Sequence, residues 1–137
     1  MRIPIISLTA AGTAAAAAAF LALPGVINAN DDVPRWQQAR AVGEAESCIP
    51  LRSIRNTRVR DDRTIDFYMN GRRIYRNTLP QNCGSLGFDR AFSYRTSLSQ
   101  LCSTDIITVL PQPISNSIPG ASCGLGEFTP IELPDRG

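Results

Sequence analysis

Residues 57–77 read TRVRDDRTIDFYMNGRRIYRN and contain the clearest indication of the fold in the sequence. Apolar and polar side chains alternate through it in two-residue steps, which is the periodicity of strands that bury one face. Two turn signals, Asp61-Asp62-Arg63 and Asn70-Gly71, interrupt the alternation. Because an Asn-Gly pair between alternating runs is a strong hairpin signal, the stretch predicts three antiparallel strands in a meander.

The turns also predict the register of this meander. The first turn, taken as three residues long, places Val59 opposite Ile65. The second, taken as two residues long, places Phe67 opposite Ile74. The polar face then carries three cross-strand rows, Arg58–Asp66–Tyr75, Asn56–Tyr68–Arg73 and Arg60–Thr64–Asn77. In this register Asp66 is an exposed partner of Arg58, and an exposed pair contributes at most about 1 kcal/mol.

The flanking sequence adds further short strands and many turns. Residues 106–110 are a β-branched run typical of a buried strand, and residues 120–128 predict a last strand. The aromatic segment 88–101 fits a shorter strand or an irregular connection. The sequence therefore predicts a mostly β fold, in which a small antiparallel meander of about five to six strands closes into a barrel-like or strongly bent sheet.

The first residues have the layout of a secretory signal peptide. Arg2 precedes a long uncharged stretch, and Pro24-Gly25 breaks it shortly before the small Ala29. Cleavage after Ala29 is expected, whereas the many weakly apolar alanines disfavour the alternative, an uncleaved membrane anchor. The expected organisation is a signal peptide at 1–29, an N-terminal arm or short helix at 30–47, a disulfide-stapled β domain at 48–129 and a C-terminal tail at 130–137. This layout predicts a periplasmic or secreted protein with no stable membrane span after cleavage.

The four cysteines all lie in the expected mature chain and predict two disulfides, because export leads to an oxidising compartment. No pair has the close spacing of a zinc knuckle, so we expect no metal site. Four cysteines permit three connectivities, and the favoured one joins Cys83 to Cys102 and Cys48 to Cys123. Each bridge would stabilise the fold by about 3–4 kcal/mol.

The composition removes much of the usual catalytic chemistry. All fourteen basic residues are arginines, and the chain contains neither histidine nor lysine. Dyads that use histidine, imidazole metal ligands and Schiff-base lysines are therefore excluded. We expect no cofactor, and a small carboxylate-dependent hydrolase is the enzymatic alternative that remains. The net charge of +2 is too balanced to predict a nucleic-acid partner.

Arginines concentrate in the predicted meander, where they are interleaved with tyrosines. A guanidinium offers a planar donor fork and a tyrosine ring offers a stacking surface, so such a face can bind carboxylates, phosphates or sugar rings. The simpler interpretation is a solvated sheet face kept soluble by arginine. The candidate binding residues are Arg58, Arg60, Tyr68, Arg73 and Tyr75.

Five segments between Cys48 and Phe128 carry a resemblance to a known family. They are DDRTI at 61–65, YRNTLP at 75–80, Cys83 with LGF at 86–88, LCSTDII at 101–107, and GASCGLG at 120–126. Through these segments the chain resembles a family of small exported proteins of Gram-negative bacteria that is grouped as a domain of unknown function. The resemblance implies export and a four-cysteine, β-rich fold, and it implies no particular chemistry.

These observations predict an exported, non-enzymatic binding module. Its expected partner is an anionic or carbohydrate-containing component of the cell envelope, or another exported protein. The alternatives are the carboxylate-dependent hydrolase and a purely structural envelope protein. A cleft that holds two carboxylates about 5–10 Å apart would favour the hydrolase, whereas a flat basic face would favour binding.

Overall fold

A computed structural model describes residues 12, 33–113 and 118–136. The expected signal peptide lies outside these residues, apart from Gly12. The described part is mostly β, with ten short strands in three antiparallel sheets, which confirms the predicted class. No helix within it is long or apolar enough to cross a membrane. Its two disulfides indicate an oxidising, non-cytoplasmic compartment.

The largest sheet contains the predicted meander together with the first and last strands, β1 and β10. Its strand order is β1-β10-β5-β4-β3. The strands are β1 (Arg40–Ala41), β3 (Ile54–Val59), β4 (Thr64–Met69), β5 (Ile74–Thr78) and β10 (Phe128–Glu132). Because β1 lies in the expected N-terminal arm and β10 extends into the expected C-terminal tail, the folded domain reaches beyond the boundaries of 48 and 129.

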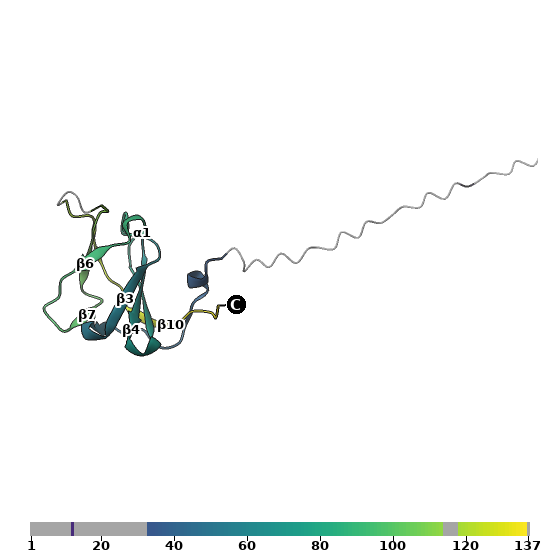
Figure 1. The fold of residues 1–137 in the computed structure, drawn as a ribbon, viewed down its shortest axis with the longest axis horizontal. Coiled ribbons are helices and arrows are strands. Elements are labelled where there is room, and N and C mark those ends of the chain that lie inside the picture. The colour runs from purple at the N-terminus through teal and green to yellow at the C-terminus, as the bar shows by residue number, and fades with distance from the viewer. Residues whose placement is uncertain (1–11, 13–32, 114–117, 137) are drawn as a thin grey trace, which may run out of the picture.

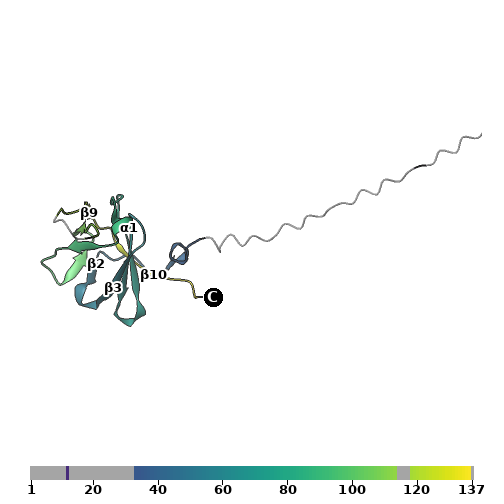
Figure 2. The same ribbon diagram turned by 45° about the horizontal axis from the view of Figure 1, so that its top comes forward.

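Two smaller sheets and four short helical segments complete the fold. One small sheet pairs β2 (Cys48–Pro50) with β7 (Gln100–Cys102), and the other has the order β6 (Phe92–Tyr94), β8 (Ile106–Val109), β9 (Ser122–Gly124). Figure 1 shows β6 and β7 to one side of β3, β4 and β10, and Figure 2 shows β2 and β9 on the same side of β3 and β10. The helical segments are η1 (Arg35–Gln38), η2 (Leu51–Ser53), η3 (Asn70–Arg72) and α1 (Leu86–Asp89).

The hydrophobic core lies where the three sheets meet. Phe67 on β4 is fully buried at its centre, and its ring packs edge-on against Phe128 at 5.5 Å and Phe92 at 6.3 Å between ring centroids. The small sheets contribute buried Ile49, Leu101, Ile107 and Val109 to the same cluster. Strands from all three sheets therefore stabilise one another through a shared apolar interior.

The predicted barrel-like closure is not observed. The part of the chain that the structure describes forms three separate sheets and no closed barrel. The strands of the two small sheets are only three or four residues long. Strands this short cannot continue the hydrogen-bond ladder around the core, so side-chain packing and the disulfides close the fold instead.

The first predicted turn is confirmed and the second is wrong by one residue. Strands β3 and β4 pair with Val59 opposite Ile65, as the 61–63 turn requires. Strands β4 and β5 instead pair with Phe67 opposite Tyr75, because the connection is the three-residue segment η3 and not Asn70-Gly71 alone. Gly71 and Arg72 both adopt positive φ there, at 75° and 64°.

This shift moves every side chain of β5 to the face opposite the predicted one. Tyr75 and Asn77 become buried on the core side, whereas Ile74 and Arg76 lie on the outer face beside Tyr68 and Asp66. The predicted rows that placed Tyr75, Arg73 and Asn77 on the polar face are therefore wrong. The longer turn is favoured because it buries the tyrosine ring and pairs a second guanidinium with Asp66.

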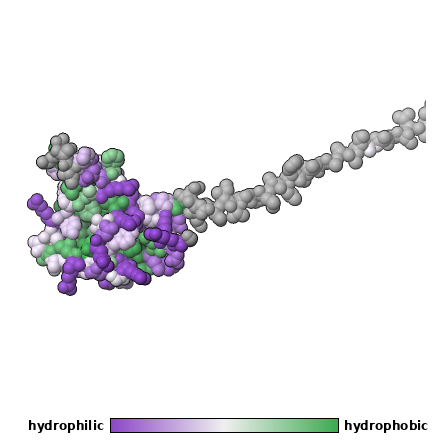
Figure 3. All heavy atoms as spheres, in the orientation of Figure 1, coloured by the Kyte–Doolittle hydropathy of each residue, from purple (hydrophilic) through white to green (hydrophobic). Residues whose placement is uncertain are grey.

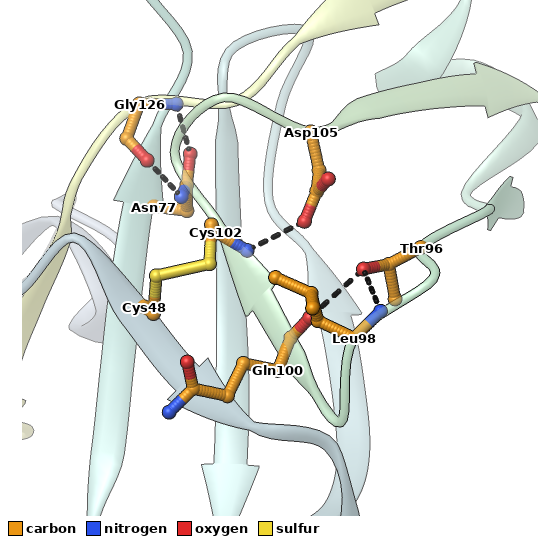
Figure 4. Close-up of a disulfide and its surroundings, with 8 residues drawn as sticks. All are labelled: Cys48, Asn77, Thr96, Leu98, Gln100, Cys102, Asp105 and Gly126. Atoms are coloured by element: carbon orange, nitrogen blue, oxygen red, sulfur yellow. Dashed lines mark hydrogen bonds between the residues drawn. A yellow bond between two sulfur atoms is a disulfide. The ribbon is translucent and has the colours of Figure 1, made fainter.

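The disulfide pairing also differs from the predicted one, because the structure joins Cys48 to Cys102 and Cys83 to Cys123. Strand β2 pairs with β7 in the register that places Cys48 directly opposite Cys102, with 4.0 Å between their Cα atoms. Asp105 supports this corner by accepting a 2.7 Å hydrogen bond from the Cys102 amide (Figure 4). A disulfide joins cysteines that the fold brings together, and for Cys48 and Cys102 the pairing of β2 with β7 does this.

Asn77 connects the large sheet to the segment that leads into β10. Its side-chain amide donates to the Gly126 carbonyl at 2.6 Å, and its side-chain oxygen accepts from the Gly126 amide at 2.8 Å (Figure 4). The buried side chain of Asn77 therefore makes the two hydrogen bonds to the Gly126 backbone that a neighbouring strand would otherwise make. None of its own polar atoms is left unsatisfied. A Cβ atom at Gly126 would collide with the Thr78 carbonyl oxygen.

We predict that Gly126→Ala lowers the free energy of unfolding by about 1–3 kcal/mol, since the added methyl group must push two backbone segments apart. Gly124→Ala is the matched control, because a Cβ at Gly124 meets no heavy atom within 4 Å. The control should stay within about 0.5 kcal/mol of the parent protein. Urea denaturation of both variants measures this difference, and equal stabilities would contradict the close approach at Gly126.

Candidate anion-binding groove

The outer face of the large sheet carries a buried carboxylate held by two arginines. Asp66 is fully buried although it lies on the face that points away from the core. Arg76 forms a two-pronged ion pair with it, through Nε to Oδ1 at 2.7 Å and Nη2 to Oδ2 at 2.9 Å. Arg60 donates a further bond from Nε to Oδ2 at 2.8 Å. The predicted exposed pair between Arg58 and Asp66 is therefore replaced by a buried network.

Aromatic rings extend this network at both ends. The Arg60 guanidinium also donates to the Tyr68 hydroxyl at 2.9 Å, and the Arg58 guanidinium lies over the Tyr68 ring at 5.5 Å. At the other end Arg76 lies over the ring of Trp36, in η1, at 5.7 Å. Because each guanidinium is attracted to an aromatic face, the rings hold the arginines in defined positions.

A groove of about 550 Å³ runs across this face. Segment η1 and the C-terminal residues 132–136 contribute to its walls, and Arg35 holds them together by donating from Nε to the Pro134 carbonyl at 2.6 Å. Figure 3 shows hydrophilic side chains interspersed with hydrophobic ones on the surface in the region of β3, β4 and β10. The groove is lined by Arg35, Trp36, Arg58, Arg60, Tyr68, Arg72, Ile74, Ile131, Glu132, Leu133, Asp135 and Arg136.

Three arginines of the groove have guanidinium groups that are free to bind a ligand. Arg60 is engaged by Asp66, and Arg35 by the Pro134 carbonyl. Within the described residues the side chains of Arg58, Arg72 and Arg136 make no hydrogen bond or ion pair. Unpaired guanidinium forks are suited to binding carboxylate or phosphate groups, and that of Arg58 is also held over the Tyr68 ring.

Two carboxylates line the groove at its other side, where the C-terminal segment lies. Glu132 is paired with the exposed Arg40 at 2.8 Å. This hydrogen bond and the charge of Glu132 raise the pKa of Arg40, and the charge of Asp135 acts in the same direction. Arg40 therefore neutralises part of the negative charge at this side of the groove.

The structure brings together three of the five predicted site residues. Arg58, Arg60 and Tyr68 line the groove, whereas Arg73 and Tyr75 do not. Tyr75 is 6% exposed on the core side. Burial raises the pKa of its phenol, and Glu46 raises it further as a hydrogen-bond acceptor and as a negative charge. Arg73 remains exposed at the end of the turn that precedes β5, outside the groove.

Sequence reasoning missed the groove residues that come from η1 and from the C-terminal segment. Trp36, Leu133 and Arg136 are far from the meander in sequence, and no local pattern places them beside it. The only tryptophan of the protein, in a segment without a hydrophobic repeat, was a signal that this segment packs against something. Arg72 was missed because the predicted turn was one residue too short.

The carboxylates near the 61–63 turn stabilise the fold. Asp62 accepts a hydrogen bond from the Gly87 amide at 2.7 Å, and Asp61 accepts one from the Arg63 amide at 2.8 Å. Both side chains line an open depression beside Asn82, where they cap a turn and attach it to α1. In the described residues no group of three or more potential ligands could hold a metal ion.

No protein-family model matches the sequence, and neither a curated protein nor a solved structure shows significant similarity to it.

Proposed function

We propose that the protein is an exported, non-enzymatic binding module that uses the groove to hold an anionic or carbohydrate-containing component of the cell envelope. The observation that carries the proposal is the set of three unpaired guanidinium groups beside two aromatic rings in one groove. Arginine forks recognise anionic groups, and the rings of Trp36 and Tyr68 offer apolar surface to a sugar or another flat group. The groove is of the size that ligand sites usually have.

The two disulfides and the apolar, alanine-rich start of the sequence support the proposed site of action, the periplasm or the cell exterior. The resemblance to small exported proteins of Gram-negative bacteria points the same way. An envelope component is a ligand that such a protein would meet, and many envelope polymers are negatively charged.

We predict that the purified exported protein binds a mixture of anionic envelope glycans and that the affinity falls as salt is raised, because charged groups contribute to it. Removing two of the free guanidinium groups, in Arg58→Ala with Arg72→Ala, should weaken binding by at least about tenfold. Isothermal titration calorimetry at low and moderate salt measures both effects.

The matched control is Arg55→Ala with Arg95→Ala, which removes the same net charge from exposed arginines outside the groove. This control should bind like the parent protein. Equal losses in the two double variants would show that binding depends on overall charge and not on the groove. A parent protein that binds none of the glycans would refute the proposed function itself.

A further inference from the structure

The outer face of the sheet already binds one carboxylate, that of Asp66. Arg76 meets it with two parallel N–H groups, and Arg60 adds a third. Each of these guanidiniums is also in contact with an aromatic side chain, Trp36 in one case and Tyr68 in the other. Asp66 therefore shows how a carboxylate is held on this face, by guanidinium forks beside aromatic rings.

Arg58 and Arg72 offer the same donors to a carboxylate from outside. Arg58 lies over the Tyr68 ring, and neither its guanidinium nor that of Arg72 has an internal acceptor within the described part of the chain. Apolar Ile74 lines the same groove. Next to such apolar surface a singly charged carboxylate loses less hydration free energy than a doubly charged phosphate, so the groove favours the carboxylate.

The C-terminal side of the groove favours hydroxyl groups. Glu132 and Asp135 present acceptor oxygens there, and Arg40 already neutralises part of their charge. The ligand therefore need not supply a cation in addition to Arg40 to balance these carboxylates. Neutral O–H groups of the ligand can donate hydrogen bonds to their oxygens. A ligand that combines carboxylates with hydroxyl groups on a ring matches both sides at once.

We propose that the groove binds a carboxylated glycan, an oligosaccharide of uronic-acid units. Its carboxylates pair with Arg58 and Arg72, and its hydroxyl groups donate to the acceptors of the C-terminal side. The rings of Trp36 and Tyr68 pack against the sugars. This assignment of a ligand class rests on the proposed function and makes it more specific.

Trp36 allows a direct test, because it is the only tryptophan in the protein and lines the groove. The emission of the purified protein is measured while a galacturonate trimer is added. We expect a saturable change in emission.

The fully methyl-esterified trimer, which keeps the rings but lacks the charges, should need at least about tenfold higher concentration to give the same change in emission. Arg58→Ala with Arg72→Ala should shift the trimer titration by the same factor, and Arg55→Ala with Arg95→Ala should leave it unchanged.

Three results would overturn the ligand class. They are equal affinity for the trimer and its methyl ester, tighter binding of glucose 1-phosphate than of the trimer, and binding only of a zwitterionic aminouronate trimer. In each of these cases the proposed function stands if the glycan mixture still binds the parent protein and binds the Arg58 and Arg72 double variant at least tenfold less tightly. Failure of both the trimer and the mixture would refute the ligand class and the proposed function together.

Discussion

Replacing Asp66 with alanine is expected to lower the free energy of unfolding by about 3–5 kcal/mol, because it leaves two guanidinium groups without their shared buried anion. The carboxylate is fully buried, and the side chains of Arg60 and Arg76 are each only 15% exposed. Chemical denaturation monitored by far-UV circular dichroism measures the loss. Arg58→Ala, on the same face and with its guanidinium over the Tyr68 ring, should cost no more than about 1 kcal/mol.

A second variant tests whether the unpaired buried charges of Arg60 and Arg76, and not another effect of Asp66→Ala, cause the loss of stability. Replacing the whole network by apolar groups, with Asp66→Leu, Arg60→Met and Arg76→Met, should recover much of the stability, since buried ion pairs contribute little beyond a well-packed apolar core. A stability of Asp66→Ala within 1 kcal/mol of the parent would instead support the exposed Arg58–Asp66 pair expected from the sequence.

Reduction of both disulfides is expected to unfold the protein. The bridges join residues 54 and 40 positions apart, and loops of this length correspond to about 3–4 kcal/mol of stabilisation each. Their combined loss approaches the whole stability of a typical small domain. Circular dichroism before and after reduction tests this, and an unchanged melting temperature would contradict it. Two double variants, Cys48→Ser with Cys102→Ser and Cys83→Ser with Cys123→Ser, each lack one bridge. Each should lose about half of the stability that the two bridges contribute together.

Peptide mapping of the unreduced protein tests the pairing itself. Cleavage after arginine leaves Cys102 and Cys123 in one peptide, 96–136, and a further cut before Asp105 separates them. The structure predicts that peptide 41–52 is linked to 96–104, whereas the pairing favoured by the sequence would link 41–52 to a peptide that begins at Asp105. The two products differ in mass, so one measurement decides between them.

The groove shows which parts of a site local sequence predicts. Arg58, Arg60 and Tyr68 were found because the β3–β4 register follows from a turn and an alternation that lie within a few residues of each other. Trp36 was not predicted as a site residue, because it contacts Arg76, which follows it in the sequence only after most of the meander. Only the packing of η1 and the C-terminal segment against the sheet turns a basic face into a groove.

Local sequence is enough to predict the β class, the meander, the formation of two disulfides and the restriction of the chemistry to arginines, carboxylates and hydroxyls. The β4–β5 register and the partner of each cysteine depend on tertiary structure. Local turn chemistry favours a two-residue turn at Asn70-Gly71, whereas the folded chain has a three-residue turn after Met69. The choice between them depends on burying Tyr75, pairing Asn77 with the distant Gly126 and placing Arg76 beside Asp66, and these interactions exist only once the chain is folded.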